Sequence, residues 1–290
     1  NWSFLLRPIG SGIVVSELRA DIGGAKLEAK PKSEKPGAEF TWLRADGTDI
    51  SHFSGMVSSS DLVTVFETWG QSKALETKGA SLVGDLTWLG SPAAISLAGL
   101  EGDVTMDIDE GRFFKNTGRA SNALLRLFGL FNFDSWARRL RLDFSDLYKG
   151  GMAFDAIDGR LSFAQGQLFL VEPIKVDTPS ASLQMGGRID LREETLDTSM
   201  VATLPVGGNA TLLAAFAAGL PVAAGVYVMN KLFKRQVDKV ASVSYQMTGP
   251  WSDPKVKFHR LFDNKAAKRA AESGREASNA ARQHTSEPAE

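Results

Sequence analysis

Residues that could carry out acid–base, nucleophilic or metal chemistry are few and widely spaced in this sequence. The three histidines are His52, His259 and His284, and none has a second histidine or an acidic residue at the spacing typical of a metal site. None of them stands in the pattern of a catalytic triad. The chain has no cysteine, which excludes disulfides, thiolate metal sites and thiol catalysis. The sequence therefore favours a function without catalysis.

The acidic run Asp107–Gly111 resembles the beginning of a calcium-binding loop. However, Arg112 stands where that loop requires glycine, and Gly118 stands where it requires a bidentate glutamate. We expect a hairpin turn here and no metal site. Asp143 and Asp146 could form a pair of carboxylates, although a turn at the end of a strand explains them equally well.

The remaining motifs and the composition also argue against several classes of protein. Gly10-Ser-Gly12 lacks the third glycine and the following helix of a dinucleotide loop, so we expect a turn here. Taken with the absence of catalytic motifs, this predicts a chain with no cofactor and no enzyme activity. The formal charge of −1 over 290 residues lacks the basic excess of a nucleic-acid-binding protein. The chain begins at Asn1 without a signal-peptide pattern. We expect it to be the C-terminal piece of a longer protein, with any targeting segment upstream.

A stretch without charge, Thr198 to Asn230, is the most unusual feature of the sequence. Its densest part, Ala210–Met229, approaches the length of roughly 20 residues that a membrane-spanning helix needs. Gly219–Pro221 interrupts it, because proline removes a helical hydrogen bond, so we expect a broken helical hairpin. We expect the following residues to contact a membrane: Leu212, Leu213, Phe216, Leu220, Val222, Val226, Tyr227, Lys231, Lys234 and Arg235. A buried helical plug inside the fold explains the pattern equally well.

Period-two alternation over short runs predicts that most of the chain is strand. The alternation is visible, for example, at Trp2/Phe4/Leu6 and Val104/Met106/Ile108. Glycine-containing turn signals separate the runs, at Gly23-Gly24, Asp46-Gly47, Glu110-Gly111, Asp158-Gly159, Gly166 and Gly186-Gly187. The connections are too short for crossover helices, which favours an antiparallel meander over a parallel sheet.

Four helical or irregular segments divide this pattern. We expect strands over 1–118 with one inserted helix at 60–69 that has a serine N-cap, amphipathic helices over 119–141, and strands again over 142–206. The apolar hairpin would occupy 207–240, with terminal strands over 241–262 and a disordered tail over 263–290. The segment Ser121 to Arg141 suits either a lid over an apolar site or a helix at a membrane surface.

Several blocks of sequence resemble the YhdP group of AsmA-like proteins, in order and in spacing. These blocks are Leu86–Pro92 (LTWLGSP), Leu100–Phe113 (LEGDVTMDIDEGRF), Leu127–Asn132 (LFGLFN), Leu142–Leu147 (LDFSDL) and Val243–Pro254 (VSYQMTGPWSDP). The resemblance extends from about Phe40 to Phe258.

The resemblance implies an envelope protein of Gram-negative bacteria with an inner-membrane anchor upstream of this chain. The family fold is an elongated, twisted antiparallel sheet curled into an open apolar groove, and the family carries phospholipids between the inner and outer membranes. This chain would be the end nearest the outer membrane. Its partners would be phospholipid acyl chains and the outer-membrane surface or a protein of the outer membrane or periplasm, with no nucleic acid.

The apolar faces of the expected strands are the candidates for lining such a groove, because alternation stacks them on a common side. They are Leu82, Leu86, Trp88, Val104, Met106, Ile108, Leu161, Phe163, Leu168, Leu170, Leu183, Met185, Ile189, Leu191, Met200 and Leu204. An ordinary β-sandwich core would show the same alternation. A structural or assembly module that binds a protein partner through its sheet edges is the competing functional class.

Overall fold

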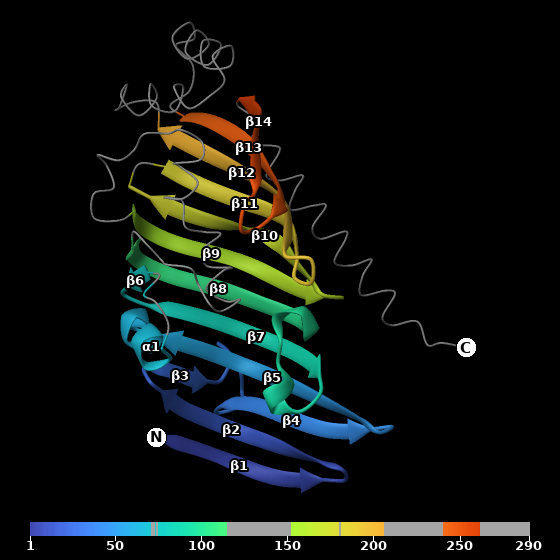
Figure 1. Ribbon diagram of the computed structural model, residues 1–290. Helices are drawn as coiled ribbons and strands as arrows, with labels where there is room; N and C mark the ends of the chain where they lie inside the picture. The colour runs from blue at the N-terminus through green and yellow to red at the C-terminus, as the bar shows by residue number, and fades with distance from the viewer. Residues whose placement is uncertain (71–72, 74, 115–151, 180, 206–239, 262–290) are drawn as a thin grey trace, which may run out of the picture.

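The described part of the chain is a single antiparallel sheet of 14 strands (Figure 1). The computed structural model describes residues 1–70, 73, 75–114, 152–179, 181–205 and 240–261. The strands are β1 (Trp2–Ile9), β2 (Gly12–Ile22), β3 (Ala25–Glu28), β4 (Ala38–Ala45), β5 (Thr48–Ser59), β6 (Leu75–Thr77), β7 (Ala80–Leu89), β8 (Leu100–Phe113), β9 (Met152–Ala164), β10 (Gln167–Thr178), β11 (Ala181–Asp190), β12 (Thr195–Pro205), β13 (Val240–Pro250) and β14 (Lys255–Leu261).

The strand order follows the chain order from β7 to β14, as the alternation and short connections predicted. The order departs from a simple meander near the N-terminus, where β3 and β4 both lie between β2 and β5 and together occupy one strand position. Residues 29–37 connect these two short strands. β6 continues the line of β7 along the edge of β8. The expected large, mainly β antiparallel architecture is therefore confirmed.

Short turns containing glycine join many of the strands, as expected. Gly10 and Ser11 connect β1 to β2, and Asp46 and Gly47 connect β4 to β5. Both glycines have positive φ, +50° at Gly10 and +78° at Gly47, which a residue without a Cβ adopts most readily. The expectation that Gly10-Ser-Gly12 forms a turn is confirmed.

Three other glycine-containing motifs that we expected to form turns lie inside strands, so those expectations were wrong. Glu110-Gly111 lies inside β8, Asp158-Gly159 inside β9, and Gly186-Gly187 inside β11. The acidic run from Asp107 is likewise part of a strand and no hairpin. The glycines serve close packing instead: a Cβ on Gly111 would lie 2.6 Å from the Phe154 ring, and a Cβ on Gly159 would lie 2.9 Å from the Ile174 side chain.

The single α-helix in the described residues, α1 (Leu62–Thr68), packs at one end of the strands. Its N-cap is Asp61, whose carboxylate accepts hydrogen bonds from the Thr64 amide at 3.1 Å and the Thr64 hydroxyl at 2.6 Å. The expected serine cap was therefore displaced by one position, since the carboxylate is the better acceptor for the free amides of the first turn. Val65 and Phe66 form the buried side of the helix. Two short 3₁₀ helices, η1 (Pro92–Ala94) and η2 (Leu97–Gly99), precede β8.

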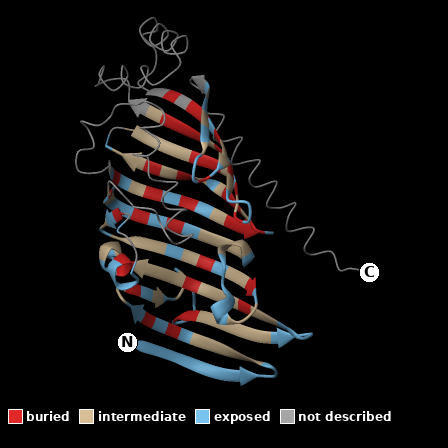
Figure 2. Ribbon diagram, in the orientation of Figure 1, coloured by how far each residue is buried: buried red, intermediate tan, exposed pale blue. Residues whose placement is uncertain are grey.

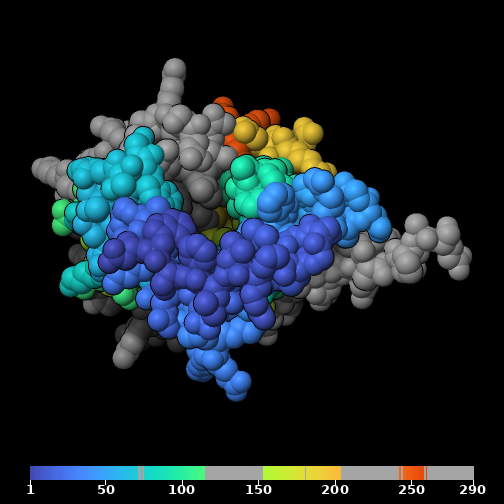
Figure 3. Space-filling model, turned by 90° about the horizontal axis from the view of Figure 1, so that it is seen from below, coloured from blue at the N-terminus to red at the C-terminus, as the bar shows by residue number. Residues whose placement is uncertain are grey.

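Burial changes across the sheet. β1 is exposed along its whole length, whereas buried positions recur throughout β8 to β12 (Figure 2). Seen from the β1 end, the N-terminal strands form the surface of the molecule (Figure 3). The main hydrophobic cluster runs from Phe66 and Leu75 to Trp251, so the core extends along most of the sheet.

The amphipathic segment 119–141, the apolar hairpin 207–240 with its membrane-contacting residues, and the tail 263–290 lie outside the described residues. No helix of the described segments is long and apolar enough to cross a membrane.

Candidate functional site

One face of the sheet is apolar across nearly all of its strands. Residues that are register partners in neighbouring strands lie on the same face, so the pairing traces each face from strand to strand. One row crosses nine strands, from β2 to β12, and contains a single glycine among apolar residues: Val15, Phe40, Phe53, Leu86, Gly102, Phe163, Leu168, Ile189 and Leu196. A second row contains Ile108, Ile157, Val176, Leu183 and Ala202. We call this side of the sheet the apolar face.

The structure places the expected groove residues on or next to this face. Leu82, Leu86 and Trp88 alternate along β7, and Val104, Met106 and Ile108 alternate along β8 on the same face. Leu82 pairs with Met106, whereas Val104 and Ile108 lie opposite the small residues Gly84 and Ala80. The buried members of the expected set are Trp88, Met106, Ile108, Phe163, Leu168, Leu170, Met185, Ile189, Leu191 and Met200. Leu86, Val104, Leu161 and Leu183 are partly buried against them, and Leu82 is 36% exposed. Leu204 of β12 pairs with Ala241 of β13, and its side chain lies outside the described part of the structure.

Several residues of the apolar face were not among the groove residues predicted from the sequence. They are Phe40, Phe53, Ile157, Ile174, Val176, Leu196, Tyr245 and Met247. Their alternation with polar neighbours was visible, as in Phe40/Trp42 and Tyr245/Met247, but the interrupted strand position of β3 and β4 and the irregular pairing between Leu170 and Ile174 obscured the register.

Paired glycines leave a position without side chains on the apolar face in its N-terminal half. Gly55 of β5 and Gly84 of β7 are register partners, and the Phe53 ring extends over this position. A Cβ on Gly55 would lie 2.8 Å from the ring carbon Cζ of Phe53, and a Cβ on Gly84 would lie 3.7 Å from Cε1. The aromatic ring thus replaces the missing side chains of two strands.

Few polar groups are buried on the apolar face. Ser51 is fully buried and its hydroxyl donates to the Gly90 carbonyl at 2.9 Å. Tyr245 is 2% exposed, and burial raises the pKa of its phenol far above its ordinary value, so it stays neutral. Neither residue brings a charge into this face.

The opposite face of the sheet carries mostly polar side chains and ion pairs, although Phe169 and Val201 are buried on it. Its register row from β7 to β11 is Ser81, Asp107, Asp158, Lys175 and Gln184. Lys175 pairs with Asp177, Arg160 lies 3.6 Å from Asp103, and Arg188 lies 3.5 Å from Asp197. Alternating charge of this kind is typical of a solvated surface, and each exposed pair contributes little to stability.

A group on the polar face contains the residue types of a catalytic triad without its geometry. Asp85 is the centre of the group: Lys30 pairs with it, His52 Nε2 lies 2.9 Å from Oδ1, and the Ser54 hydroxyl donates to Oδ2 at 3.3 Å. Partial burial raises the pKa of Asp85, but the hydrogen bonds from Lys30 and His52 outweigh it and the net pKa is lowered. Because Ser54 donates to the carboxylate and not to histidine, the group holds no activated nucleophile.

The described residues also lack a metal site: no three His, Cys, Asp or Glu residues within them are grouped so as to hold an ion. Asp107 and Asp109 both point to the polar face of β8 and are separated by one strand residue. The apolar face is therefore the feature with functional potential.

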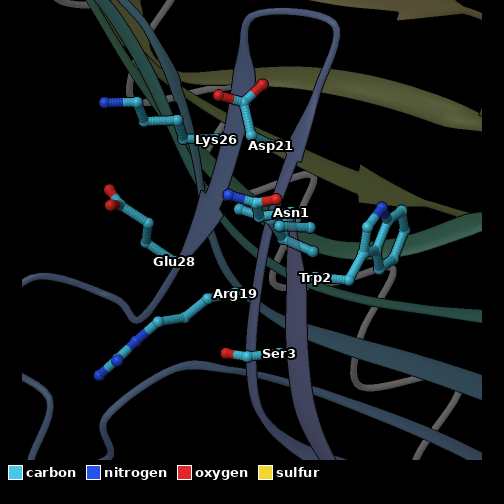
Figure 4. Close-up of a pocket in the computed structure, with 9 residues that line it drawn as sticks. Asn1, Trp2, Ser3, Arg19, Asp21, Lys26 and Glu28 are labelled. Carbon is cyan, nitrogen blue, oxygen red and sulfur yellow. The ribbon is translucent and has the colours of Figure 1, made fainter.

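A shallow pocket of about 330 Å³ lies where β1, β2 and β3 meet (Figure 4). Arg19, Lys26 and Glu28 extend to one side of the strands and Trp2 extends to the other. The charged side chains belong to the polar face, as their register partners show. This pocket is thus a feature of the strand ends and not a continuation of the apolar face.

Comparison with known proteins identifies the family of this chain. The family model described as "YhdP protein" matches residues 1–256. The intermembrane phospholipid transporter YhdP of Escherichia coli (strain K12) is 26% identical over 220 residues, which is 76% of this chain and 17% of that protein. The chain thus spans about a sixth of the length of this relative. No solved structure matches the chain. Because the family model covers most of the sequence, the chain belongs to the YhdP family.

Proposed function

We propose that this chain carries phospholipids between the two membranes of the cell envelope, with the acyl chains on the apolar face and without catalysis. The observation that carries the proposal is the register row from Val15 to Leu196, which crosses nine strands without a charged residue. The E. coli relative, a phospholipid transporter, supports the substrate class. In this proposal the sheet curls around its apolar face to form a groove.

The physical basis is the burial of hydrocarbon. Each methylene group moved from water to an apolar surface is worth about 0.8 kcal/mol, so even part of an acyl chain binds measurably. This attraction has no direction and is proportional to contact area. A lipid can therefore move from row to row along the sheet without losing its binding energy at any step. Polar headgroups would remain in water.

The segments outside the description complete the proposal. The apolar hairpin over 207–240 would touch or shallowly enter the outer membrane, with Lys231, Lys234 and Arg235 near anionic headgroups. The segment Ser121 to Arg141 would cover the end of the groove. The protein would act in the periplasm.

Lipid analysis of the purified chain tests the proposal. We expect mass spectrometry of a solvent extract to find phospholipid in the wild type and less in Leu82→Glu, which puts a charge on the partly exposed part of the apolar face. Thr105→Glu is the matched control, since Thr105 is exposed on the polar face of the neighbouring strand. Absence of phospholipid from folded wild-type protein, or equal loss in both variants, would contradict the proposal.

The exposed edge of β1 supports a second candidate, a module that binds a protein partner by strand addition. Trp2, Leu5 and Leu6 are 60%, 53% and 51% exposed, which is unusual for an edge strand. The other edge, β14, carries Lys255 and Lys257, charges of the kind that discourage pairing. Leu5→Lys should then prevent partner binding while the lipid content stays unchanged.

A further inference from the structure

The side chains of β4 change from apolar to charged in three steps along the apolar face. Ala38 is fully buried, Phe40 and Trp42 are half-buried, and Arg44 is exposed at the strand end. Phe40 pairs with Phe53, Trp42 with Ser51, and Arg44 with Asp49, so all of them share the apolar face. A glycerophospholipid has the same order of groups: acyl chain, ester, phosphodiester.

The indole of Trp42 has an unmet hydrogen-bond donor. Its neighbour two strands away, Trp88, donates from Nε1 to the Ser91 carbonyl at 3.1 Å, and the intervening Ser51 donates to the Gly90 carbonyl. Trp42 Nε1 is buried and has no acceptor. A buried donor without a partner is costly, so an acceptor supplied by a ligand would be favourable. The ring centroids of Phe40 and Trp88 lie 6.0 Å apart, which keeps the surface beside the indole aromatic and apolar.

Arg44 is placed to contact an anion beyond the indole. Its Nε and Nη2 atoms bond to the Asp49 carboxylate at 2.7 and 3.0 Å, which fixes the guanidinium at the end of the strand. The Nη1 group is outside this bidentate pair and can donate to a phosphate oxygen. The guanidinium side chain is 60% exposed and open to a ligand from solvent.

The other end of the same strands has no such gradient on the apolar face. There the register partners Ser59 and Ala80 are small and uncharged, and α1 packs Val65 against the Gly23–Gly24 turn. The cations of that end, Arg19 and Lys26, lie on the polar face. The apolar face is therefore polarised from one strand end to the other.

We propose that Phe40, Trp42 and Arg44 form a site for one glycerophospholipid that orients it along strand β4. The acyl chains lie on Phe40 and Phe53, the half-buried indole of Trp42 turns so that its N–H donates to an ester carbonyl, and Arg44 contacts the phosphodiester. Headgroups thus project at the β4–β5 turn and acyl chains extend toward α1. This inference rests on the proposed function, since it assigns an orientation to lipid bound on that face.

A labelling experiment tests the orientation. The natural chain has no cysteine, so single cysteines can be introduced on the apolar face and labelled with bimane. One replaces Ile13, the register partner of Trp42 near Arg44, and the other replaces Val57, toward the other end of the same face. The probes are phosphatidylcholines that carry a nitroxide either near the ester or near the end of the acyl chain. The ester-proximal nitroxide should quench the label at position 13 more strongly, and the chain-end nitroxide the label at position 57. Equal or reversed quenching would overturn the proposed orientation.

A pair of variants tests the role of the indole donor. Trp42→Phe keeps the ring and removes the N–H, and should weaken phosphatidylethanolamine binding about fivefold, the value of one hydrogen bond. It should leave binding of diphenylhexatriene, a probe without polar groups, unchanged. Trp69→Phe is the control, since the Trp69 indole already donates to the Ile22 carbonyl. Equal weakening for both probes would show that Trp42 contributes only packing. Competition by glycerol phosphate alone would show that the site binds free phosphate compounds and not a lipid.

The two proposals fail differently. If the wild-type chain binds neither labelled lipid nor diphenylhexatriene, the proposed function falls with this inference. If both bind but the quenching has no order along the strand, only the oriented site is lost.

Discussion

At the scale of single residues, the glycines within strands determine how closely neighbouring side chains approach. A Cβ on Gly111 would lie 2.1 Å from the Glu76 carbonyl oxygen and 2.6 Å from Phe154. The backbone oxygen cannot move without breaking the pairing of β6 with β8. The sequence could not reveal this role, because Glu110-Gly111 reads equally as a turn and Phe154 lies 43 residues away in the chain.

We therefore expect Gly111→Ala to lower the free energy of unfolding by about 1–3 kcal/mol, the usual cost of overpacking. Gly84→Ala is the matched control, since its new Cβ would meet Leu86 at an ordinary 3.6 Å. Urea titrations of both variants measure the difference. Comparable losses would show that strand glycines matter for another reason than this contact.

Asp158 lies on the polar face opposite Asp107, and its pKa is raised. Burial is the main cause, and the carboxylates of Asp177, Asp107 and Glu172 add to it, while Lys175 opposes the change. A raised carboxyl pKa means that the folded state keeps its proton longer, so stability falls as the pH rises from the ordinary carboxyl pKa through the folded one.

Asp158→Asn should remove that loss. The melting temperature of this variant, relative to that of the wild type, should therefore rise as the pH increases from about 3 to about 7. Asp49→Asn should do the opposite, because the hydrogen bond from Arg44 lowers the pKa of Asp49 and stabilises its ionised form. Melting curves that shift in the same direction in both variants would contradict this account of the charges.

At the scale of elements, α1 is a helix of 7 residues that depends on packing for its stability. Phe66 is 8% exposed and joins the hydrophobic cluster, whereas Glu67 makes an exposed ion pair with Lys73. Phe66→Ala should cost about 3 kcal/mol and Glu67→Ala less than about 1 kcal/mol, because burial outweighs an exposed pair. Thermal unfolding measures both. A loss in Glu67→Ala as large as that in Phe66→Ala would show that the helix is held mainly by charge.

The elements also show what alternation can predict. Strand-rich runs such as 100–113 and 181–190 were expected from period two, because each apolar side chain alternates with a polar one. The division of one strand position between β3 and β4 was not, since it depends on partners in β2 and β5 that no local pattern identifies. The helix at 62–68 was found from its apolar spacing, but its cap was misplaced by competition between neighbouring polar residues.

At the scale of the whole molecule, the sheet separates an apolar face from a mostly polar one, and the apolar row crosses nine of its strands. The apolar residues chosen from the sequence fall on or next to one face, since consecutive antiparallel pairing preserves the side on which alternating residues lie. What covers that face, and how the sheet is curved, depends on long-range shape that alternation does not contain. The proposed lipid transport follows from the continuity of the face.

Photo-crosslinking in cells tests the central claim most directly. A benzoylphenylalanine at Leu82 lies on the apolar face and is partly exposed, while one at the next residue, Val83, lies on the polar face opposite Thr105. We expect lipid mass spectrometry to find phospholipid attached at position 82 and not at position 83. Equal yields at both positions, or no phospholipid at position 82 in folded protein, would contradict the proposal that the apolar face carries lipid.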